Sequence, residues 1–291
     1  MAFQNSHFSL AYDRPSVTMV SQPEIPLDPK SMPGHRSYFE TLCRVVSLSL
    51  NLLRARMLPG HSDVRCHEIC DYKQYMQRIL SEAMPHLRHR ARCVTLKNHI
   101  ERIELRLHSS YLLSVICRVS MKPDSHLDDQ CRVIVSKDCI SNLINTIEAF
   151  VELHSINPHC SRSWISLQRT IASAFLLVAD PDGQCHPQTW DLIEKLEMAL
   201  ADHVYTDRPV NDSGRTDSAT HLASSLRALR EVSAAFRQKN MSQSEAGTAI
   251  PSVVSPPGIM VPCPAAANVN LLTGEMAGYV HHMEDGNMRN I

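Results

Sequence analysis

Glycine, aromatic side chains, net charge and long apolar runs are all scarce in this sequence. Only 9 of the 291 residues are glycine and only 5% are aromatic. So few glycines disfavour β-architectures that are punctuated by glycine turns, and aliphatic side chains must fill most of the core. The formal net charge of −1 provides no electrostatic footprint for nucleic acid or for an anionic membrane.

A targeting signal and a membrane-spanning segment are also missing from the pattern. Residues 1–30 lack the charged start and apolar run of a secretory signal. The longest uncharged segment, residues 246–274, contains five prolines, which prevent a continuous spanning helix. We therefore expect a soluble, intracellular protein without a membrane partner.

Ten cysteines are spread along the chain without the spacing of a zinc site or of a disulfide framework. The closest group is Cys66, His67 and Cys70, and it has no second pair at a suitable distance along the sequence. Without a secretory signal, the disulfide interpretation lacks its oxidising compartment. The sequence thus favours thiols on helix faces that behave as small apolar side chains.

Apolar residues recur every three or four positions, which predicts an all-α fold of about six or seven amphipathic helices. The expected helices begin near residues 37, 66, 91, 129, 162, 187 and 222, and the longest covers about 91–121. Phe39 opens the inward face of the first. Ser161 is the expected N-cap of the fifth helix, whose inward face is Trp164, Leu167, Ile171, Phe175 and Val178.

Proline and polar residues divide the chain into three parts. Residues 1–36 form a flexible lead-in, 37–238 a helical domain, and 239–291 a flexible tail rich in proline, serine and alanine. Residues 207–217 are a linker within the domain, and residues 180–183 have the composition of a turn.

No motif assembles a catalytic, nucleotide-binding or metal site. The glycine loops that cradle phosphate, the serine-hydrolase elbow and the His-Glu-x-x-His motif are all absent. His86 and His89 could share a helix face and bind a metal, but an exposed or interface position is the simpler interpretation. The adjacent pairs His159-Cys160 and Cys185-His186 are expected to be loop residues, because a catalytic pair needs facing side chains.

One passage has a more specific pattern. The run LHSINPHCSRSW at 153–164 continues as ISLQRTIASAFLL at 165–177, and WDLIEKLEMAL follows at 190–200. Together with AMPHL at 83–87 and LRLHSSY at 105–111, it resembles the regulatory domain of fungal binuclear zinc-cluster transcription factors, most clearly over 64–204. Where that family usually has an Arg-Pro pair, this chain has Arg118-Val119, a departure at the local helix end.

The resemblance implies a nuclear transcription regulator that controls a metabolic or secondary-metabolite pathway through its helical domain. The family's six-cysteine cluster, which binds two zinc ions and DNA, has no counterpart here. The chain thus resembles the C-terminal part of that domain, either as a stand-alone regulator or as a truncated gene product. The expected partners are other regulators, coactivators or a small-molecule effector, with no direct DNA contact, cofactor or bound metal.

Three residues of the resembling passage are candidates for a ligand-binding or regulatory surface: His154, Arg162 and Trp164. The simpler interpretation places Trp164 in the core and pairs Arg162 with a helix end or a carboxylate. We expect no catalytic residues and no enzymatic activity. Two alternatives remain open, an all-helical biosynthetic enzyme using His154, His159 and Cys160, and a module that competes for the partners of a full-length factor.

Overall fold

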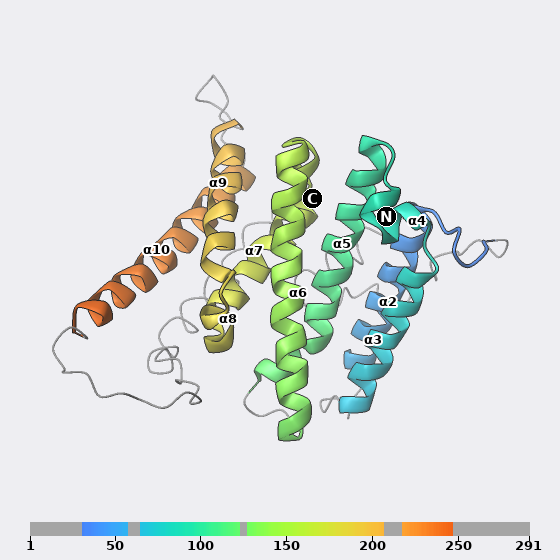
Figure 1. Ribbon diagram of the computed structural model, residues 1–291, viewed down its shortest axis with the longest axis horizontal. Coiled ribbons are helices and arrows are strands. Elements are labelled where there is room, and N and C mark those ends of the chain that lie inside the picture. The colour runs from blue at the N-terminus through green and yellow to red at the C-terminus, as the bar shows by residue number, and fades with distance from the viewer. Residues whose placement is uncertain (1–30, 58–64, 123–126, 207–216, 247–291) are drawn as a thin grey trace. The chain divides into compact units, whose positions relative to one another are not determined.

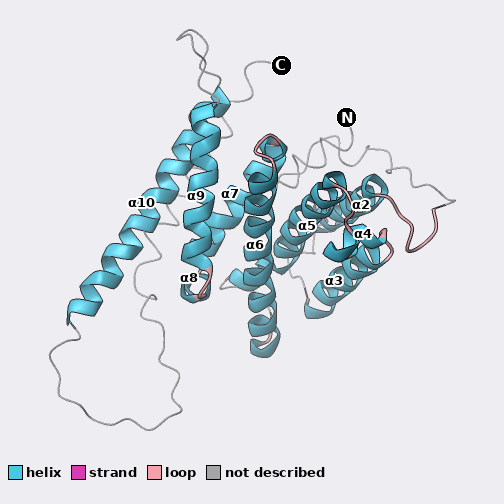
Figure 2. Ribbon diagram, turned by 45° about the horizontal axis from the view of Figure 1, so that its top comes forward, coloured by secondary structure: helices cyan, strands magenta, loops and turns pink. Residues whose placement is uncertain are grey.

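The computed structural model describes residues 31–57, 65–122, 127–206 and 217–246, and these residues contain nine α-helices. Seven of the nine have sixteen residues or more, and the described chain contains no β-strand (Figure 2). The all-helical prediction is therefore confirmed. The predicted linker at 207–217, apart from its last residue, lies outside the described residues, as do most of the lead-in and of the tail.

The chain divides into two compact units, Met1–Ala174 and Phe175–Ile291. Unit 1 contains most of α7 and five other helices: α2 (Tyr38–Met57), α3 (Cys66–Ser81), α4 (Pro85–Arg88), α5 (Leu96–Cys117) and α6 (Asp129–Ile156). Helix α7 (Trp164–Ala179) crosses into unit 2, which also holds α8 (Pro181–Cys185), α9 (Thr189–Thr206) and α10 (Asp217–Ala246). Figure 1 shows these elements along the chain.

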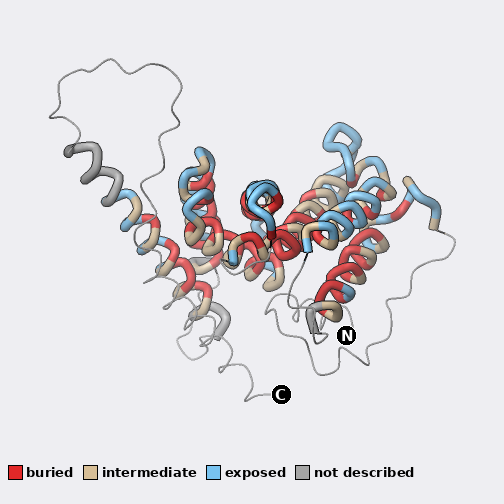
Figure 3. Tube along the Cα trace, turned by 90° about the horizontal axis from the view of Figure 1, so that it is seen from below, coloured by how far each residue is buried: buried red, intermediate tan, exposed pale blue. Residues whose placement is uncertain are grey.

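Helix α5 is the centre of unit 1, because α6, α2, α3 and α4 all pack against it (Figure 1). Its buried residues run from Ile103 to Cys117, and the facing side of α6 contributes Leu143, Ile147 and Phe150. Residues buried in this way are red in Figure 3. Burying these aliphatic faces removes apolar surface from water and stabilises the packing of α6 on α5.

Local capping sets the starts of several helices, and α5 and α8 depart from the predicted pattern. Helix α5 begins at Leu96, five residues later than expected, because the Thr95 side chain accepts a hydrogen bond from Asn98 N at 3.2 Å. Asp128 caps α6 in the same way, with Cys131 N at 2.8 Å. Asp180 caps the short helix α8 through Gly183 N at 2.9 Å, so residues 180–183 open a helix where a turn was expected.

Residues just before α2 are fixed to the end of α3. Gly34 N donates to Glu82 O at 2.7 Å, and Met84 N donates to Arg36 O at 2.9 Å. The Arg36 side chain is buried and forms an ion pair with Glu82. Helix α3 ends at Ser81, and the main-chain groups that follow it pair with the segment before α2.

Two predicted apolar faces are partly wrong. Phe39 is 68% exposed, although the rest of α2 from Leu42 to Leu53 is largely buried. On α7, Leu167 and Val178 are buried as expected, whereas Trp164, Ile171 and Phe175 are only half-buried. The most buried positions of α7 include four polar residues: Ser166, Arg169, Thr170 and Ser173.

A disulfide joins Cys66 to Cys131, with their Cα atoms 6.4 Å apart. The expectation that the cysteines form no disulfide is therefore wrong for this pair. The two residues are 65 positions apart in sequence, and the packing of α3 and α6 around α5 brings them together.

Unit 2 is built around the packing of α9 on α10. Ile193, Leu196 and Leu200 of α9 are buried, as are Leu222, Leu226 and Leu229 of α10. Trp190 stacks on Phe236 with ring centroids 3.9 Å apart, and its Nε1 donates to Gln184 O at 3.0 Å. The indole thus satisfies its polar group while covering apolar surface.

Candidate functional site

The sequence-predicted surface residues lie at the corner between α6 and α7, defined here as residues 154–164. His154 occupies the last turn of α6, and its Nδ1 is 3.1 Å from Ser161 Oγ. The Ser161 hydroxyl also lies 2.9 Å from Pro158 O, to which it donates. Ser161 is not the N-cap of α7, because it belongs to the 3₁₀ turn Cys160–Arg162 that precedes the helix.

The chemistry of this contact favours a structural role for Ser161. A hydroxyl has one proton, so a Ser161 that donates to Pro158 accepts from His154 Nδ1–H. Ser161 is completely buried, and a substrate cannot reach it in this conformation. The pair fixes the path of the chain from α6 into α7 and does not have the geometry of an exposed serine nucleophile activated by a base.

Arg162 and Trp164 are two more accessible residues of the corner. Arg162 is exposed in the 3₁₀ turn, and Trp164 is the half-buried first residue of α7. His159, in the preceding loop, is also exposed. A cationic side chain beside a partly accessible indole is a combination that protein-binding surfaces often use.

A buried polar centre lies further along α7, and no pattern in the sequence indicates it. Arg169 is 2% exposed, and its Nη1 lies 2.6 Å from His108 Nδ1 on α5. The guanidinium carbons of Arg169 and Arg118 lie 5.1 and 5.7 Å from the centroid of the Tyr111 ring. Such distances permit cation–π attraction. We call His108, Tyr111, Arg118 and Arg169 the buried centre.

The hydrogen bond within the buried centre defines which group donates. Burial lowers the pKa of Arg169 to about 10, while Tyr111 opposes the shift. The guanidinium is therefore still charged at pH 7 and can only donate. His108 must accept at Nδ1, so that its own proton lies on Nε2.

Polar groups around this centre are mostly satisfied within their own helices. Thr170 Oγ1 donates to Ser166 O at 2.8 Å, and Ser109 Oγ donates to Leu105 O at 2.8 Å. The hydroxyl of Ser173 and two guanidinium nitrogens of Arg118 are buried without a hydrogen-bond partner among the described residues. Burying such groups without a partner lowers the stability of the fold. The polar packing therefore defines how α7 lies on α5 at a cost in stability.

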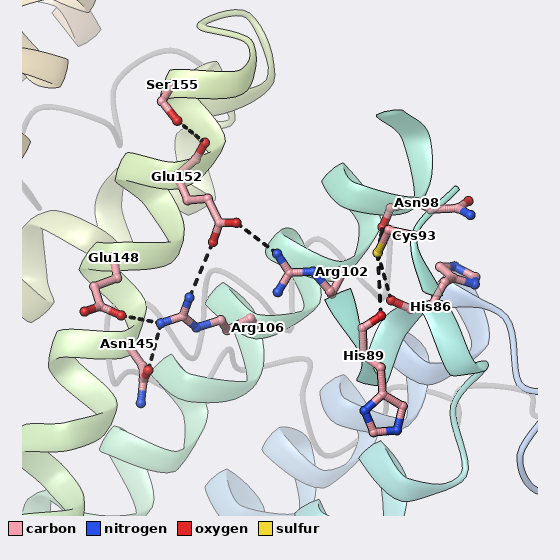
Figure 4. A network of polar contacts seen from close by, with 10 residues as sticks. All are labelled: His86, His89, Cys93, Asn98, Arg102, Arg106, Asn145, Glu148, Glu152 and Ser155. Atoms are coloured by element: carbon pink, nitrogen blue, oxygen red, sulfur yellow. Dashed lines mark hydrogen bonds and ion pairs between the residues drawn. The ribbon is translucent and has the colours of Figure 1, made fainter. Parts of the chain in front are cut away.

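A network of arginines and acids connects α5 to α6 beside the corner (Figure 4). Arg102 Nη2 donates to Glu152 Oε1 at 2.9 Å, and Arg106 Nη1 lies 3.4 Å from Glu152 Oε2. Arg106 also forms an ion pair with Glu148 and donates to Asn145 Oδ1 at 2.9 Å. The network fixes the register of α6 against α5 close to His154.

The two histidines considered as metal ligands have other partners. His86 Nε2 lies 3.2 Å from Glu101 Oε2. Cys93 Sγ lies 3.3 Å from the His86 carbonyl oxygen and 3.9 Å from that of His89, and its single S–H donates to one of these main-chain acceptors at a time (Figure 4). Within the described ranges no three His, Cys, Asp or Glu side chains are arranged to hold a metal ion.

A titratable pair lies between α2 and α5. Tyr38 OH donates to Glu104 Oε2 at 2.8 Å. Burial raises the pKa of Glu104, the Tyr38 hydrogen bond lowers it, and repulsion by Glu101 raises it further. The pKa of Tyr38 is raised by burial and by the same two carboxylates. The phenol therefore stays protonated and acts only as a donor.

Unit 2 contains a shallow hollow of about 410 Å³ between α9 and α10. Val204, Leu226 and Arg230 are among its lining residues. It contains no His, Cys or Asp, and the corner remains the better candidate for function.

Comparisons with models of known protein families, with curated proteins and with solved structures find no match to this chain. Among the helices described, none has the length and apolar character needed to cross a membrane.

Proposed function

We propose that this chain is a nuclear transcription regulator of the fungal zinc-cluster type. Its helical units would bind another regulator, a coactivator or a small effector, and it would make no direct contact with DNA. The observation that carries the proposal is the resemblance of residues 153–177 and 190–200, whose order follows the end of α6, α7 and α9.

Two features of the molecule support a role in partner binding. In the corner Arg162 is exposed and Trp164 is half-buried, while His154 contacts the buried Ser161. A partly accessible indole and an exposed arginine are residue types that protein-recognition surfaces favour. The net charge of −1 offers no excess of cationic side chains for the phosphate contacts that dominate DNA affinity.

The proposal can be tested with the purified full chain and a nuclear extract. We expect the chain to retain a zinc-cluster transcription factor or its coactivator, identified by mass spectrometry. Arg162→Ala should reduce that retention, whereas Arg88→Ala, an exposed arginine of α4, should not. Circular dichroism would confirm that both variants remain folded.

Two results would count against the proposal. The first is sequence-specific DNA binding by this chain alone in an electrophoretic shift experiment. The second is that Arg162→Ala and Trp164→Ala, both folded, retain the partner as well as the wild-type chain does. The corner would then make no contribution to the interaction.

A further inference from the structure

The Cys66–Cys131 disulfide joins the first turns of two helices. Cys66 is the first residue of α3 and Cys131 is the third residue of α6. Seven residues further along both helices, Lys73 forms an ion pair with Asp138. The disulfide and this ion pair therefore link α3 directly to α6, in addition to the packing of each helix on α5.

Both sulfurs lie at helix N-termini, and for Cys66 this position favours release of its thiolate. A thiolate at such a position is stabilised by the helix dipole. A better stabilised thiolate is a better leaving group in thiol–disulfide exchange. Asp128 and Asp129 at the start of α6 oppose this effect for Cys131, whereas no acidic residue of α3 precedes Glu68 in its first turn.

Access to the two sulfurs differs. Cys66 is half-buried, whereas Cys131 is buried. An incoming thiolate therefore reaches the Cys66 sulfur first, and Cys131 is the leaving group. Nearby Cys117 does not compete as an attacking thiol, because burial raises its pKa to about 12, although Lys73 opposes the shift.

We propose that the Cys66–Cys131 disulfide is a redox-controlled link, which dithiol reductants open and disulfide oxidants close in the folded chain. One thiolate of the dithiol attacks the Cys66 sulfur, forms a mixed disulfide and releases Cys131 as a thiolate. The second thiolate of the reductant then attacks the reductant sulfur of the mixed disulfide and releases Cys66 as a thiolate. Two electrons and two protons pass to the protein, and the dithiol leaves as a disulfide.

The link controls the first turn of α3. Within residues 66–70, only Ile69 is buried. Once the disulfide opens, the remaining anchors of that turn are the buried Ile69 and local hydrogen bonds. These include Arg65 N to Glu68 Oε2 at 2.9 Å and Glu68 N to Arg65 O at 3.1 Å. Local opening of such weakly anchored turns is common, so reduction should release the start of α3 while α5 and α6 stay packed.

The experiment compares hydrogen exchange of the full chain in oxidised glutathione and in dithiothreitol, with differential alkylation to record the state of each cysteine. Dithiothreitol should make Cys66 and Cys131 alkylatable without unfolding. Amides of residues 66–70 should then exchange about tenfold faster, while those of 139–153 keep their rates. Cys66→Ser and Cys131→Ser should show the faster exchange in both conditions.

Cys70→Ser is the matched control, because Cys70 is an exposed cysteine one turn after Cys66. It should behave as the wild-type chain in both conditions. The proposal is overturned if Cys66 and Cys131 become alkylatable only after global unfolding, or if opening leaves exchange of 66–70 unchanged. Loss of the response in Cys70→Ser, or a peptide linking Cys66 to Cys70, would also overturn it.

Discussion

Arg169 of α7 donates a 2.6 Å hydrogen bond from Nη1 to Nδ1 of His108 on α5, and both side chains are buried. This contact explains why α7 turns a polar stripe inward. The guanidinium lies over Tyr111, and Ser166, Thr170 and Ser173 share the buried side of the helix. The orientation of α7, and with it the direction in which Arg162 and Trp164 face, depends on a polar contact as well as on apolar packing.

Replacing Arg169 by alanine should destabilise unit 1 by about 3 kcal/mol, because it removes packing and leaves His108 without its donor. Arg169→Met should lower the free energy of unfolding by less, because the methionine side chain keeps most of the volume and carries no buried charge. The measurement is urea unfolding followed by circular dichroism. Arg88→Ala, at an exposed position, is the control and should stay within about 0.5 kcal/mol of wild type. Equal midpoints for Arg169→Ala and Arg88→Ala would show that the buried centre contributes nothing.

The sequence was sufficient to predict the class of fold and most helices, because each long helix has an apolar stripe at helical spacing. The buried residues of α6, Leu143, Ile147 and Phe150, follow that rule. Helix ends were less predictable where one side chain decides them. A single hydrogen bond to the Thr95 side chain caps α5 at residue 96. The helical pattern of the sequence continues on both sides of Thr95, so the pattern alone does not reveal this start.

The candidate site could be located only in part. The corner was found from residues 153–164, because its motif is local in sequence. The buried centre was not, since Arg169 and His108 are 61 positions apart and an arginine within an apolar run gives no signal of burial. Cys66 and Cys131 were missed for the same reason, as nothing in their local sequence distinguishes a paired cysteine from a thiol on a helix face.

Replacing Glu104 by glutamine should remove a pH dependence of stability. Burial raises the pKa of Glu104 in the folded chain above its ordinary value of 4.5. Protonation therefore favours the folded state, and this stabilisation is present below pH 4.5 and is lost as the pH rises through the folded pKa. Glutamine resembles the protonated form and can still accept from Tyr38. Urea midpoints should show Glu104→Gln at least as stable as wild type at pH 7, with the two converging near pH 4.

The control for this prediction is Glu231→Gln, whose carboxylate is 71% exposed on α10. It should leave the slope of stability against pH unchanged. A Glu104→Gln chain that is clearly less stable than wild type at pH 7 would show that the charged carboxylate, with its Tyr38 hydrogen bond, is favoured in the folded state.

Replacing Arg106 by alanine should weaken the packing of α6 on α5 by about 1 kcal/mol. The guanidinium contacts Glu148, Glu152 and Asn145, and its side chain is 30% exposed, so solvent screens part of the attraction. A double-mutant cycle with Glu152→Ala isolates the coupling. The coupling free energy should fall as salt is raised from low to physiological concentration.

The control is Lys195→Ala, which breaks an exposed pair with Asp191 and should change stability by less than about 0.5 kcal/mol. Zero coupling at low salt would contradict the prediction.

Replacing Gly183 by alanine should disturb the start of unit 2. A Cβ atom at this position would lie 2.3 Å from the carbonyl oxygen of Leu177, and main-chain atoms cannot move aside cheaply. The Gly183 carbonyl also accepts from the buried Thr189 hydroxyl at 2.7 Å, so a shift of α8 propagates to α9. We expect a loss of about 2 kcal/mol in the free energy of unfolding.

In a Trp164→Phe background, fluorescence of Trp190 reports the change directly, because its indole bonds to Gln184 of α8 and stacks on Phe236. Gly34→Ala is the comparison: its space is open, and the cost of about 1 kcal/mol arises from a φ of +85°. It should leave the Trp190 emission unchanged, and an equally silent Gly183→Ala would show that α8 tolerates the added methyl group.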